Sequence, residues 1–371
     1  MLRVSLRVTT CRISVWNRIF VLDMLMEETM KIFKNENIAI DFHDAGCNAR
    51  KLIYTFTPFQ FNDLDGEGFG IPFLVKNGFD VIAIKINDDS WYQYIDDEIL
   101  SKTSAYSEKY DDVITYGSSM GAYAAILFSG NLKADKIIAI SPQFSIKDDF
   151  DIRWKKEALA VRWSREITPQ CLSEKGDYYI IYDNYFHLDM LQVERIAAVI
   201  PPASFHPIRV PFSGHPSGHL MLDMKCLSST ILNIIGQEDF AAANIDIPVK
   251  FLINNRKALL NLARQSNDIG RTELSHIAYR RLVRSYSDNE KMMGEYVTFL
   301  ERQGMLKLAL RYMNRMISLN GANPYLLSKA ADISLRMRKY RQAMDYCERA
   351  VAIDPENRKF ANQKHEVLKR I

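Results

Sequence analysis

One five-residue segment, Gly117-Ser118-Ser119-Met120-Gly121, restricts the fold of this chain more than any other. An apolar run at 112–116 precedes it, and small and apolar residues of helical character follow at 122–128. This order predicts a strand, a tight turn and a helix, with Ser119 at the apex of the turn. A turn this sharp crowds the backbone, which explains why a glycine stands on each side of it.

Ser119 is therefore the candidate nucleophile of the chain. A serine hydroxyl attacks an acyl carbon efficiently only when a base lies beside it and N–H donors face the negative charge that develops. The helix behind Ser119 would direct its N-terminal N–H groups toward that charge. A purely structural turn is the alternative, and the order of strand, turn and helix favours the nucleophile.

From about residue 37, short β-type runs alternate with helical stretches. Most of the runs are unbroken and rich in Ile, Val, Tyr and Phe, which is typical of strands covered on both faces. The alternation predicts an α/β fold with a doubly wound, mainly parallel sheet, whose active site lies at the carboxyl ends of the strands. We expect strands at 38–42, 52–57, 80–86, 113–116, 136–140, 178–182 and 205–210, and helices at 69–77, 94–110, 119–129, 188–200 and 217–235.

The stretch 148–171 breaks this alternation. It places Trp154 and Trp163 among charged residues and is expected to form an inserted helical cap over the site.

The C-terminal third of the sequence has a different character. It contains no convincing strand, and a 34-residue period places Ser275, Ala309 and Ala343 in register. Small residues at fixed offsets let paired antiparallel helices pack closely. This pattern resembles the tetratricopeptide repeat, with about three units over 256–355 and a capping helix at 357–371.

The sequence thus predicts three parts. An N-terminal extension covers 1–36, an α/β-hydrolase-like domain covers 37–249, and an all-α helical repeat domain covers 250–371. The first twenty residues carry four arginines and no acidic residue. The arginines interrupt every long apolar run, which argues against a secretory signal. This segment is either an organelle transit sequence or an upstream extension, and we favour the extension.

The turn and the order of the strands together resemble the α/β-hydrolase family, over roughly residues 37–236. The resemblance implies catalytic partners in the order nucleophile, acid, base. The base is implied in the loop after the last strand. His215 follows a glycine close to the strand end and is the first candidate, while His219, about one helical turn farther, is the second.

The acid is implied after the preceding strand, where Asp183 and Asp189 compete. We favour Asp189, because its separation from His215 resembles the usual spacing in the family. A carboxylate in this place orients the imidazole and stabilises its charged form. An aspartate near a helix start also serves as a cap, which is the structural alternative for Asp189.

The resemblance further implies an oxyanion hole with the backbone N–H of Met120 as one donor. The second donor is expected in the loop 57–61, where proline at 58 has no N–H, so Phe59 and Gln60 are the candidates. A His-Gly-Gly-Gly-type segment is absent, which weighs against close kinship to lipases. Trp91 and Tyr92 are expected at the same rim, as a stacking platform for a sugar ring, as an acyl pocket, or as plain core.

Charge is distributed unequally along the chain. Residues 21–249 contain 20 Lys and Arg against 33 Asp and Glu, a net −13, and residues 250–371 contain 24 against 12, a net +12. This asymmetry favours separate modules, or a basic module that meets an acidic partner, although solvated helix faces give the same counts.

Several classes of protein are not supported by the sequence. The five cysteines are scattered and form no metal-binding spacing, which favours a reducing compartment and no metal. Motifs for dinucleotides, nucleoside triphosphates and nucleic acid are absent, so neither a cofactor nor a nucleic-acid partner is expected. No apolar run approaches the roughly 20 residues of a membrane span. We therefore expect a cytoplasmic protein.

The combined hypothesis is a serine hydrolase that cleaves an ester or acyl group through Ser119, His215 and Asp189. Its substrate would be a small ester or an acylated saccharide such as a polysaccharide precursor, and residues 250–371 would bind a protein partner. A non-catalytic scaffold with a hydrolase-like fold is the main rival. An acyltransferase using the same three residues is the other.

Overall fold

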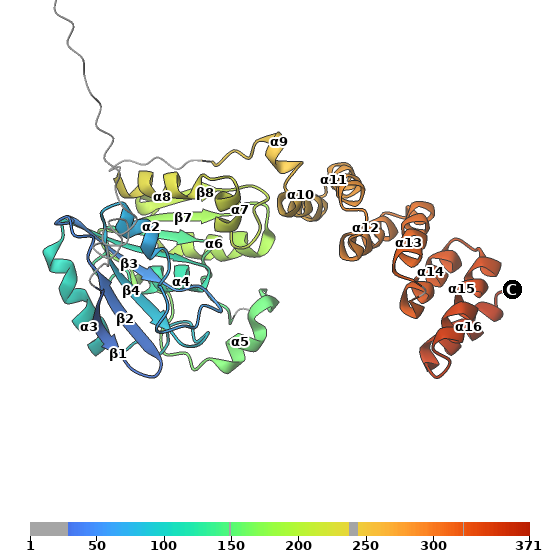
Figure 1. The fold of residues 1–371 in the computed structure, drawn as a ribbon, viewed down its shortest axis with the longest axis horizontal. Helices are drawn as coiled ribbons and strands as arrows, with labels where there is room; N and C mark the ends of the chain where they lie inside the picture. The colour runs from blue at the N-terminus through green and yellow to red at the C-terminus, as the bar shows by residue number, and fades with distance from the viewer. Residues whose placement is uncertain (1–28, 148–149, 237–243, 322) are drawn as a thin grey trace, which may run out of the picture. The chain divides into compact units, whose positions relative to one another are not determined.

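The computed structural model describes residues 29–147, 150–236, 244–321 and 323–371 (Figure 1). The chain divides into two compact units between Asp246 and Ile247. Residues 1–28, which make up most of the expected N-terminal extension, lie outside the described residues.

The first unit is built on an eight-stranded sheet with the order β1-β2-β4-β3-β5-β6-β7-β8. β1 and β4 each pair antiparallel with β2, and all other neighbours are parallel, which confirms the mainly parallel sheet. The strands are β1 (Thr29–Lys34), β2 (Ile38–His43), β3 (Lys51–Phe56), β4 (Asp80–Ile86), β5 (Asp112–Ser118), β6 (Lys136–Ile140), β7 (Asp177–Tyr182) and β8 (Phe205–Arg209).

Two elements of this unit differ from the sequence prediction. The sheet begins at β1, inside the segment 1–36 that we expected to precede the domain; this edge strand is largely exposed and carries no buried apolar run. The single helix expected at 217–235 is two helices, α7 and α8. They are separated at Lys225, whose φ of 59° does not continue a helix.

Helices cover both faces of the sheet, as a doubly wound fold requires. The cluster of buried side chains on one face includes residues of α3, α4 and α6, and the cluster on the other face includes residues of α2, α7 and α8. The helices are α2 (Ile71–Lys76), α3 (Asp97–Ser104), α4 (Met120–Leu127), α5 (Lys155–Ala160), α6 (His187–Val199), α7 (Gly218–Asp223), α8 (Leu227–Gly236) and α9 (Val249–Leu252), the last of these in the second unit.

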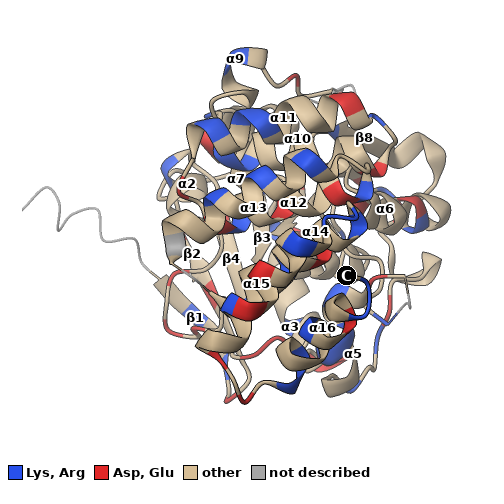
Figure 2. Cartoon of the chain, turned by 90° about the vertical axis from the view of Figure 1, so that its right-hand side faces the viewer, with Lys and Arg blue, Asp and Glu red and all other residues tan. Residues whose placement is uncertain are grey.

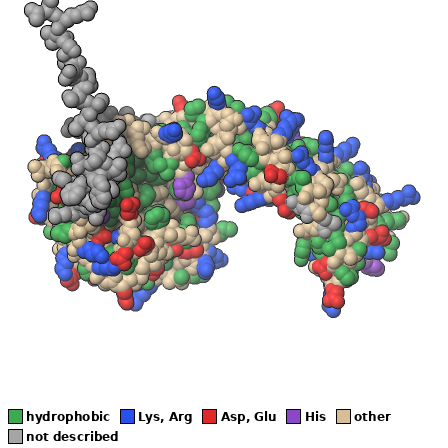
Figure 3. Space-filling view, viewed as in Figure 1, with side chains coloured by type: hydrophobic (Ala, Val, Ile, Leu, Met, Phe, Trp, Pro, Cys, Tyr) green, Lys and Arg blue, Asp and Glu red, His purple; other side chains and the backbone are tan. Residues whose placement is uncertain are grey.

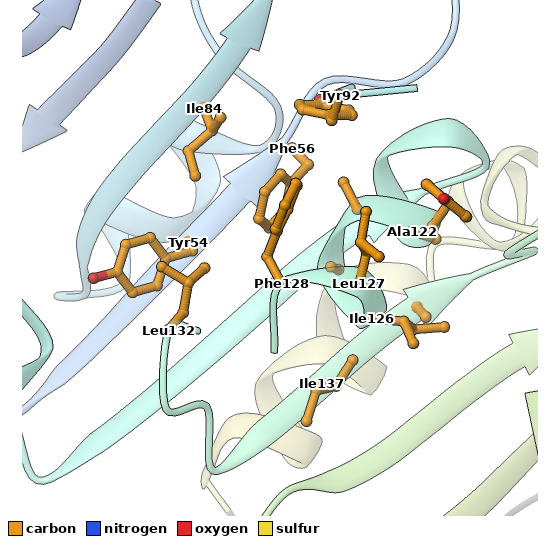
Figure 4. Close-up of a cluster of buried hydrophobic side chains, with 14 of the residues drawn as sticks. Tyr54, Phe56, Ile84, Tyr92, Ala122, Ile126, Leu127, Phe128, Leu132 and Ile137 are labelled. Carbon is orange, nitrogen blue, oxygen red and sulfur yellow. The ribbon is translucent and has the colours of Figure 1, made fainter. Parts of the chain in front are cut away.

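The strands supply side chains to the two clusters in alternation. In β3, Tyr54 and Phe56 pack in the first cluster and Ile53 packs in the second. Figure 4 shows Phe56 beside Phe128, and their stacked rings have centroids 6.1 Å apart. Because side chains of a strand alternate between faces, this pattern buries β3 on both sides.

The second unit consists of paired helices with a strict repeat. Starts of α10, α12, α14 and α16 lie at 256, 290, 324 and 358, and starts of α11, α13 and α15 lie at 272, 306 and 340, each 34 residues apart. The expected 34-residue period is therefore a period of helix pairs. The helices are α10 (Arg256–Asp268), α11 (Thr272–Ser285), α12 (Glu290–Arg302), α13 (Leu306–Asn320), α14 (Pro324–Arg336), α15 (Tyr340–Ile353) and α16 (Arg358–Leu368).

The small residues of the repeat lie where helices pack. Ser275, Ala309 and Ala343 are each fully buried, in α11, α13 and α15. An asparagine also recurs at each first-helix N-cap, where its side chain accepts a backbone N–H bond of the first turn: Asn255, Asn289, Asn323 and Asn357. Lys and Arg are spread along the helices of this unit, as Figures 2 and 3 show.

Candidate active site

The backbone turns sharply at Ser119, between the end of β5 and the start of α4. Ser119 has φ 53° and ψ −118°, a conformation that non-glycine residues rarely adopt. A Cβ on Gly117 would overlap the backbone carbonyl of Gly121, and a Cβ on Gly121 would overlap the carbonyl of Phe56. Both glycines are therefore required sterically. Strain held at one residue by its surroundings is common at functional sites.

The structure brings Ser119, His215 and Asp189 together. The Ser119 Oγ lies 2.9 Å from His215 Nε2, and His215 Nδ1 lies 2.8 Å from one carboxylate oxygen of Asp189 and 3.0 Å from the other. Ser119 is only 5% exposed and Asp189 only 1%. Asp189 is the third residue of α6 and directs its side chain at the imidazole, so it does not serve as the helix cap. The three groups have the geometry of a nucleophile, a base and an orienting acid.

Asp183, the other candidate for the catalytic acid, binds backbone N–H groups and so has a different role. It follows β7, is fully buried, and accepts backbone N–H bonds from Phe212 (3.1 Å) and Gly214 (2.7 Å). It thereby fixes the loop that carries His215. His219, the alternative base, is an exposed residue in the first turn of α7, and the imidazole that lies 2.9 Å from Ser119 Oγ is that of His215. Of the candidates, the structure therefore brings Asp189 and His215 together with Ser119.

The insertion at 148–171 contacts this group, and the residues described in it begin at 150. Arg153 Nη1 lies 3.1 Å from Asp189 Oδ1, and Arg153 also forms two bonds to Asp151, from Nε (2.7 Å) and Nη2 (2.6 Å). Burial acts to raise the pKa of the Asp151 carboxyl. Hydrogen bonds from Arg153 and Gln192 and the charge of Arg153 outweigh burial and hold that pKa below its ordinary value.

Gln143 is a residue of the site that the sequence analysis missed. Its Nε2 lies 3.2 Å from Ser119 Oγ and 3.3 Å from His215 Nε2, and its side chain is fully buried. No motif marks it in the sequence. The one available signal was its position just after β6, at the carboxyl edge of the strand beside β5.

The candidate oxyanion donors fall into two groups. The N–H of Met120, the first residue of α4, and the N–H of Phe59 have no hydrogen-bond partner among the described residues. The N–H of Gln60 instead donates to Asp89 Oδ1 over 2.7 Å. Gln60 is thereby removed from the candidates, since its N–H is already bound.

Trp91 and Tyr92 do not form an open platform. Both are fully buried, and the hydroxyl of Tyr92 donates to the carbonyl of Thr57 over 2.8 Å. They are part of the core beneath the loop that carries Phe59. An aromatic side chain that does lie beside the site is Trp154, whose ring centroid is 6.2 Å from that of His215 and 5.0 Å from that of Phe59.

Within the described residues, no group of three or more His, Cys, Asp or Glu side chains is arranged to hold a metal ion. The four cysteines in this part of the chain, Cys47, Cys171, Cys226 and Cys347, are free thiols. No helix in the described ranges is both long and apolar enough to cross a bilayer.

No protein-family profile matches the chain, and no curated protein sequence matches it. Among solved structures, an esterase of Pyrococcus furiosus aligns over 57% of this chain and 92% of its own length, with 15% identity and a TM-score of 0.39. MamA aligns over 31% of this chain, with 11% identity and a TM-score of 0.28, and the alignment spans 62% of MamA. The first TPR domain of RPAP3, bound to an HSP90 peptide, aligns over 31% of this chain and 90% of its own, with 15% identity and a TM-score of 0.27.

These similarities are too distant to define a family or an activity.

Proposed function

We propose that the protein is a serine hydrolase that cleaves an ester or a similar acyl bond. The observation that carries the proposal is the continuous hydrogen-bonded series from Ser119 Oγ through His215 to Asp189. Ser119 Oγ attacks the acyl carbon and His215 Nε2 takes its proton. The imidazolium then gives that proton to the departing alcohol, and water releases the acyl group in a second step.

The negative oxygen of each tetrahedral intermediate needs donors that are already in place. The N–H of Met120 and the N–H of Phe59 are the proposed donors, because both have unused hydrogen-bonding capacity within the described residues. A donor of this kind contributes about 10²- to 10³-fold to the rate.

The site favours a small acyl group. Ser119 is 5% exposed, and the rings of Phe59 and Trp154 pack against each other next to His215. A long acyl chain would need a wide, open groove at this place. An acetylated sugar or polysaccharide precursor is the proposed natural substrate, since aromatic rings suit the flat apolar faces of a sugar.

Labelling with a fluorophosphonate probe tests the proposal. The full chain should be labelled and should hydrolyse p-nitrophenyl acetate, and Ser119→Ala should lose both properties while keeping its circular dichroism spectrum. A wild-type chain without Ser119-dependent labelling and turnover would favour the rival reading, a non-catalytic scaffold. An acyltransferase would be recognised by an added alcohol or sugar that outcompetes water for the acyl group.

We further propose that the second unit binds an acidic segment of a protein partner. A groove of about 630 Å³ is lined by α10, α11, α12 and α14, and its charged lining consists of four cations, Arg264, Lys291, Arg302 and Lys329, and two acids, Asp268 and Glu295. Arg264 is paired with Glu295, and Lys329 lies 3.3 Å from Glu301, outside the lining. Lys291 and Arg302 have no such partner among the described residues.

A fluorescent poly-glutamate peptide tests this second proposal. It should bind the full chain more tightly than uncharged poly-glutamine does, with an affinity that falls as salt rises. The double variant Lys291→Glu with Arg302→Glu should lose that binding and keep p-nitrophenyl acetate turnover. Equal binding of both peptides would contradict the proposal.

A further inference from the structure

The amide of Gln143 contacts both atoms between which the catalytic proton moves. Its Nε2 lies 3.2 Å from Ser119 Oγ and 3.3 Å from His215 Nε2. The mechanism proposed above gives this residue no task, because the nucleophile, the base, the acid and the oxyanion donors are all other groups.

Gln143 is held in place from both sides. Before it, the N–H of Ser141 donates to the carbonyl of Ile181 over 2.7 Å, and the Oγ of Ser141 accepts the N–H of Ser217. After it, Gln192 Oε1 accepts the N–H of Phe144 over 2.7 Å. These bonds fix the backbone on both sides of Gln143, and a fixed backbone helps to position its side chain in advance for a reaction.

The other end of the same amide lacks a partner. Gln143 Oε1 is buried and has no hydrogen bond among the described residues. A buried acceptor left without a donor destabilises the folded state. Because Oε1 and Nε2 belong to one planar amide, the unpartnered oxygen lies beside the catalytic serine and histidine. It is a buried acceptor without a donor among the described residues.

We infer that Gln143 is a catalytic residue of the second half-reaction, in which its Oε1 accepts one O–H of the hydroxyl compound that attacks the acyl-enzyme. This inference rests on the proposed serine hydrolase function. In that step the oxygen of water or an alcohol bonds to the acyl carbon, and its proton passes to His215 Nε2. The tetrahedral intermediate then collapses, the bond to Ser119 Oγ breaks, and Oγ regains the proton from His215.

The placement of the amide distinguishes this role from that of an oxyanion donor. The incoming hydroxyl must lie next to His215 Nε2, because that atom removes its proton, and Gln143 is in contact with that atom. In the proposed mechanism the oxyanion is bound by the N–H groups of Met120 and Phe59, which are different groups from the Gln143 amide. The Gln143 amide is therefore on the side where the attacking hydroxyl enters.

Pre-steady-state hydrolysis of p-nitrophenyl acetate by the full chain separates the two half-reactions. In Gln143→Met, which keeps the length of the side chain and removes its amide, acylation should stay within about 3-fold of wild type, and deacylation should fall about 30- to 100-fold. Intact-mass measurement during turnover should then find acetylated Ser119 accumulating. Gln170→Met makes the same change at an exposed site and should behave as wild type.

Added methanol separates the two sources of the hydroxyl group. If water is the natural co-substrate, methanol should accelerate wild-type deacylation only modestly, whereas a strong preference for methanol would identify an alcohol. In Gln143→Met both routes should slow together.

Three results would overturn the inference. Deacylation at the wild-type rate in Gln143→Met would do so, and so would an equal loss in acylation and deacylation, which an oxyanion donor or a general structural defect would produce. If Gln143→Met fails to fold, Gln143→Asn, which withdraws the amide from both catalytic atoms, carries the same expectation and the same refutation. A wild-type chain without Ser119-dependent labelling instead refutes the hydrolase function itself.

Discussion

Asp183 accepts a 2.7 Å hydrogen bond from the backbone N–H of Gly214, the residue just before His215. Asp189, six residues farther along the chain, binds the imidazole of His215 directly. Two buried carboxylates near the start of α6 thus act on one histidine in different ways. Asp183 shapes the backbone of its loop, and Asp189 contacts its ring.

This difference predicts distinct effects on kcat for two matched substitutions. Asp189→Asn should lower kcat by about 10⁴-fold, because the imidazole loses the acceptor that fixes its tautomer. It should also cost some stability, because Arg153 loses a charged partner. Asp183→Asn should lower the free energy of unfolding by about 1–3 kcal/mol, because one of the loop N–H groups loses its acceptor. Thermal denaturation and esterase kinetics on both variants check this. A loss of kcat in Asp183→Asn as large as that in Asp189→Asn would reverse the assignment.

The turn at Ser119 predicts a steric effect at Gly121. Gly121→Ala places a Cβ against the carbonyl of Phe56 and should destabilise the first unit by about 1–3 kcal/mol or more, since the contact is with backbone. Gly236→Ala is the control, because a Cβ there meets no atom within 4 Å. Urea unfolding of both variants provides the measurement. Equal stability of the two would show that the turn is not as tight as described.

The lowered pKa of Asp151 predicts that the free energy of unfolding depends on pH. Its pKa in the folded chain lies below the ordinary value of an aspartate, so its ionised form stabilises the fold above about pH 4, and this contribution is lost as pH falls through the folded-state pKa. Asp151→Asn should therefore cost about 1–3 kcal/mol at pH 7, and its deficit against wild type should shrink toward pH 3. Urea unfolding over this pH range tests the sign. A deficit that stays constant or grows on acidification would contradict it.

The asparagines at the N-caps of the repeated helices should stabilise the second unit. Asn289 accepts the N–H of Met292 at the start of α12. Asn289→Ala should lower the free energy of unfolding by about 1 kcal/mol, and Asn289→Asp, which keeps the acceptor, should restore most of it. Thermal unfolding of the full chain followed at 222 nm measures both. Equal effects of Ala and Asp would exclude a capping role.

Much of the architecture was predictable, because the signals were local. Unbroken apolar runs located seven of the eight strands, and the two glycines around Ser119 located the turn. β1 was missed because an exposed edge strand carries little apolar pattern. The asparagines at 255, 289, 323 and 357 stand 34 residues apart in the sequence and offered a further repeat signal that was not used.

Only those features of the site that follow from the order of the strands along the chain could be predicted. The positions of Ser119 and His215 follow from the ends of strands, but the choice between Asp183 and Asp189 depends on which carboxylate the folded loop turns toward the imidazole. Arg153 and Gln143 come from segments without a motif, and they meet the site only through tertiary packing. Trp91 and Tyr92 were predicted as rim residues because the sequence shows that they lie in a loop but does not show how deeply they are buried.

The central claim is that Ser119 and His215 act as one unit, and a double-mutant comparison tests it most directly. The quantity to measure is kcat/KM for p-nitrophenyl acetate in Ser119→Ala, His215→Ala and the double variant. We predict that each single substitution lowers kcat/KM by about 10⁴- to 10⁶-fold and that the double variant is no slower than either single one. A His215→Ala variant within a few-fold of wild type, or losses that multiply in the double variant, would contradict the account.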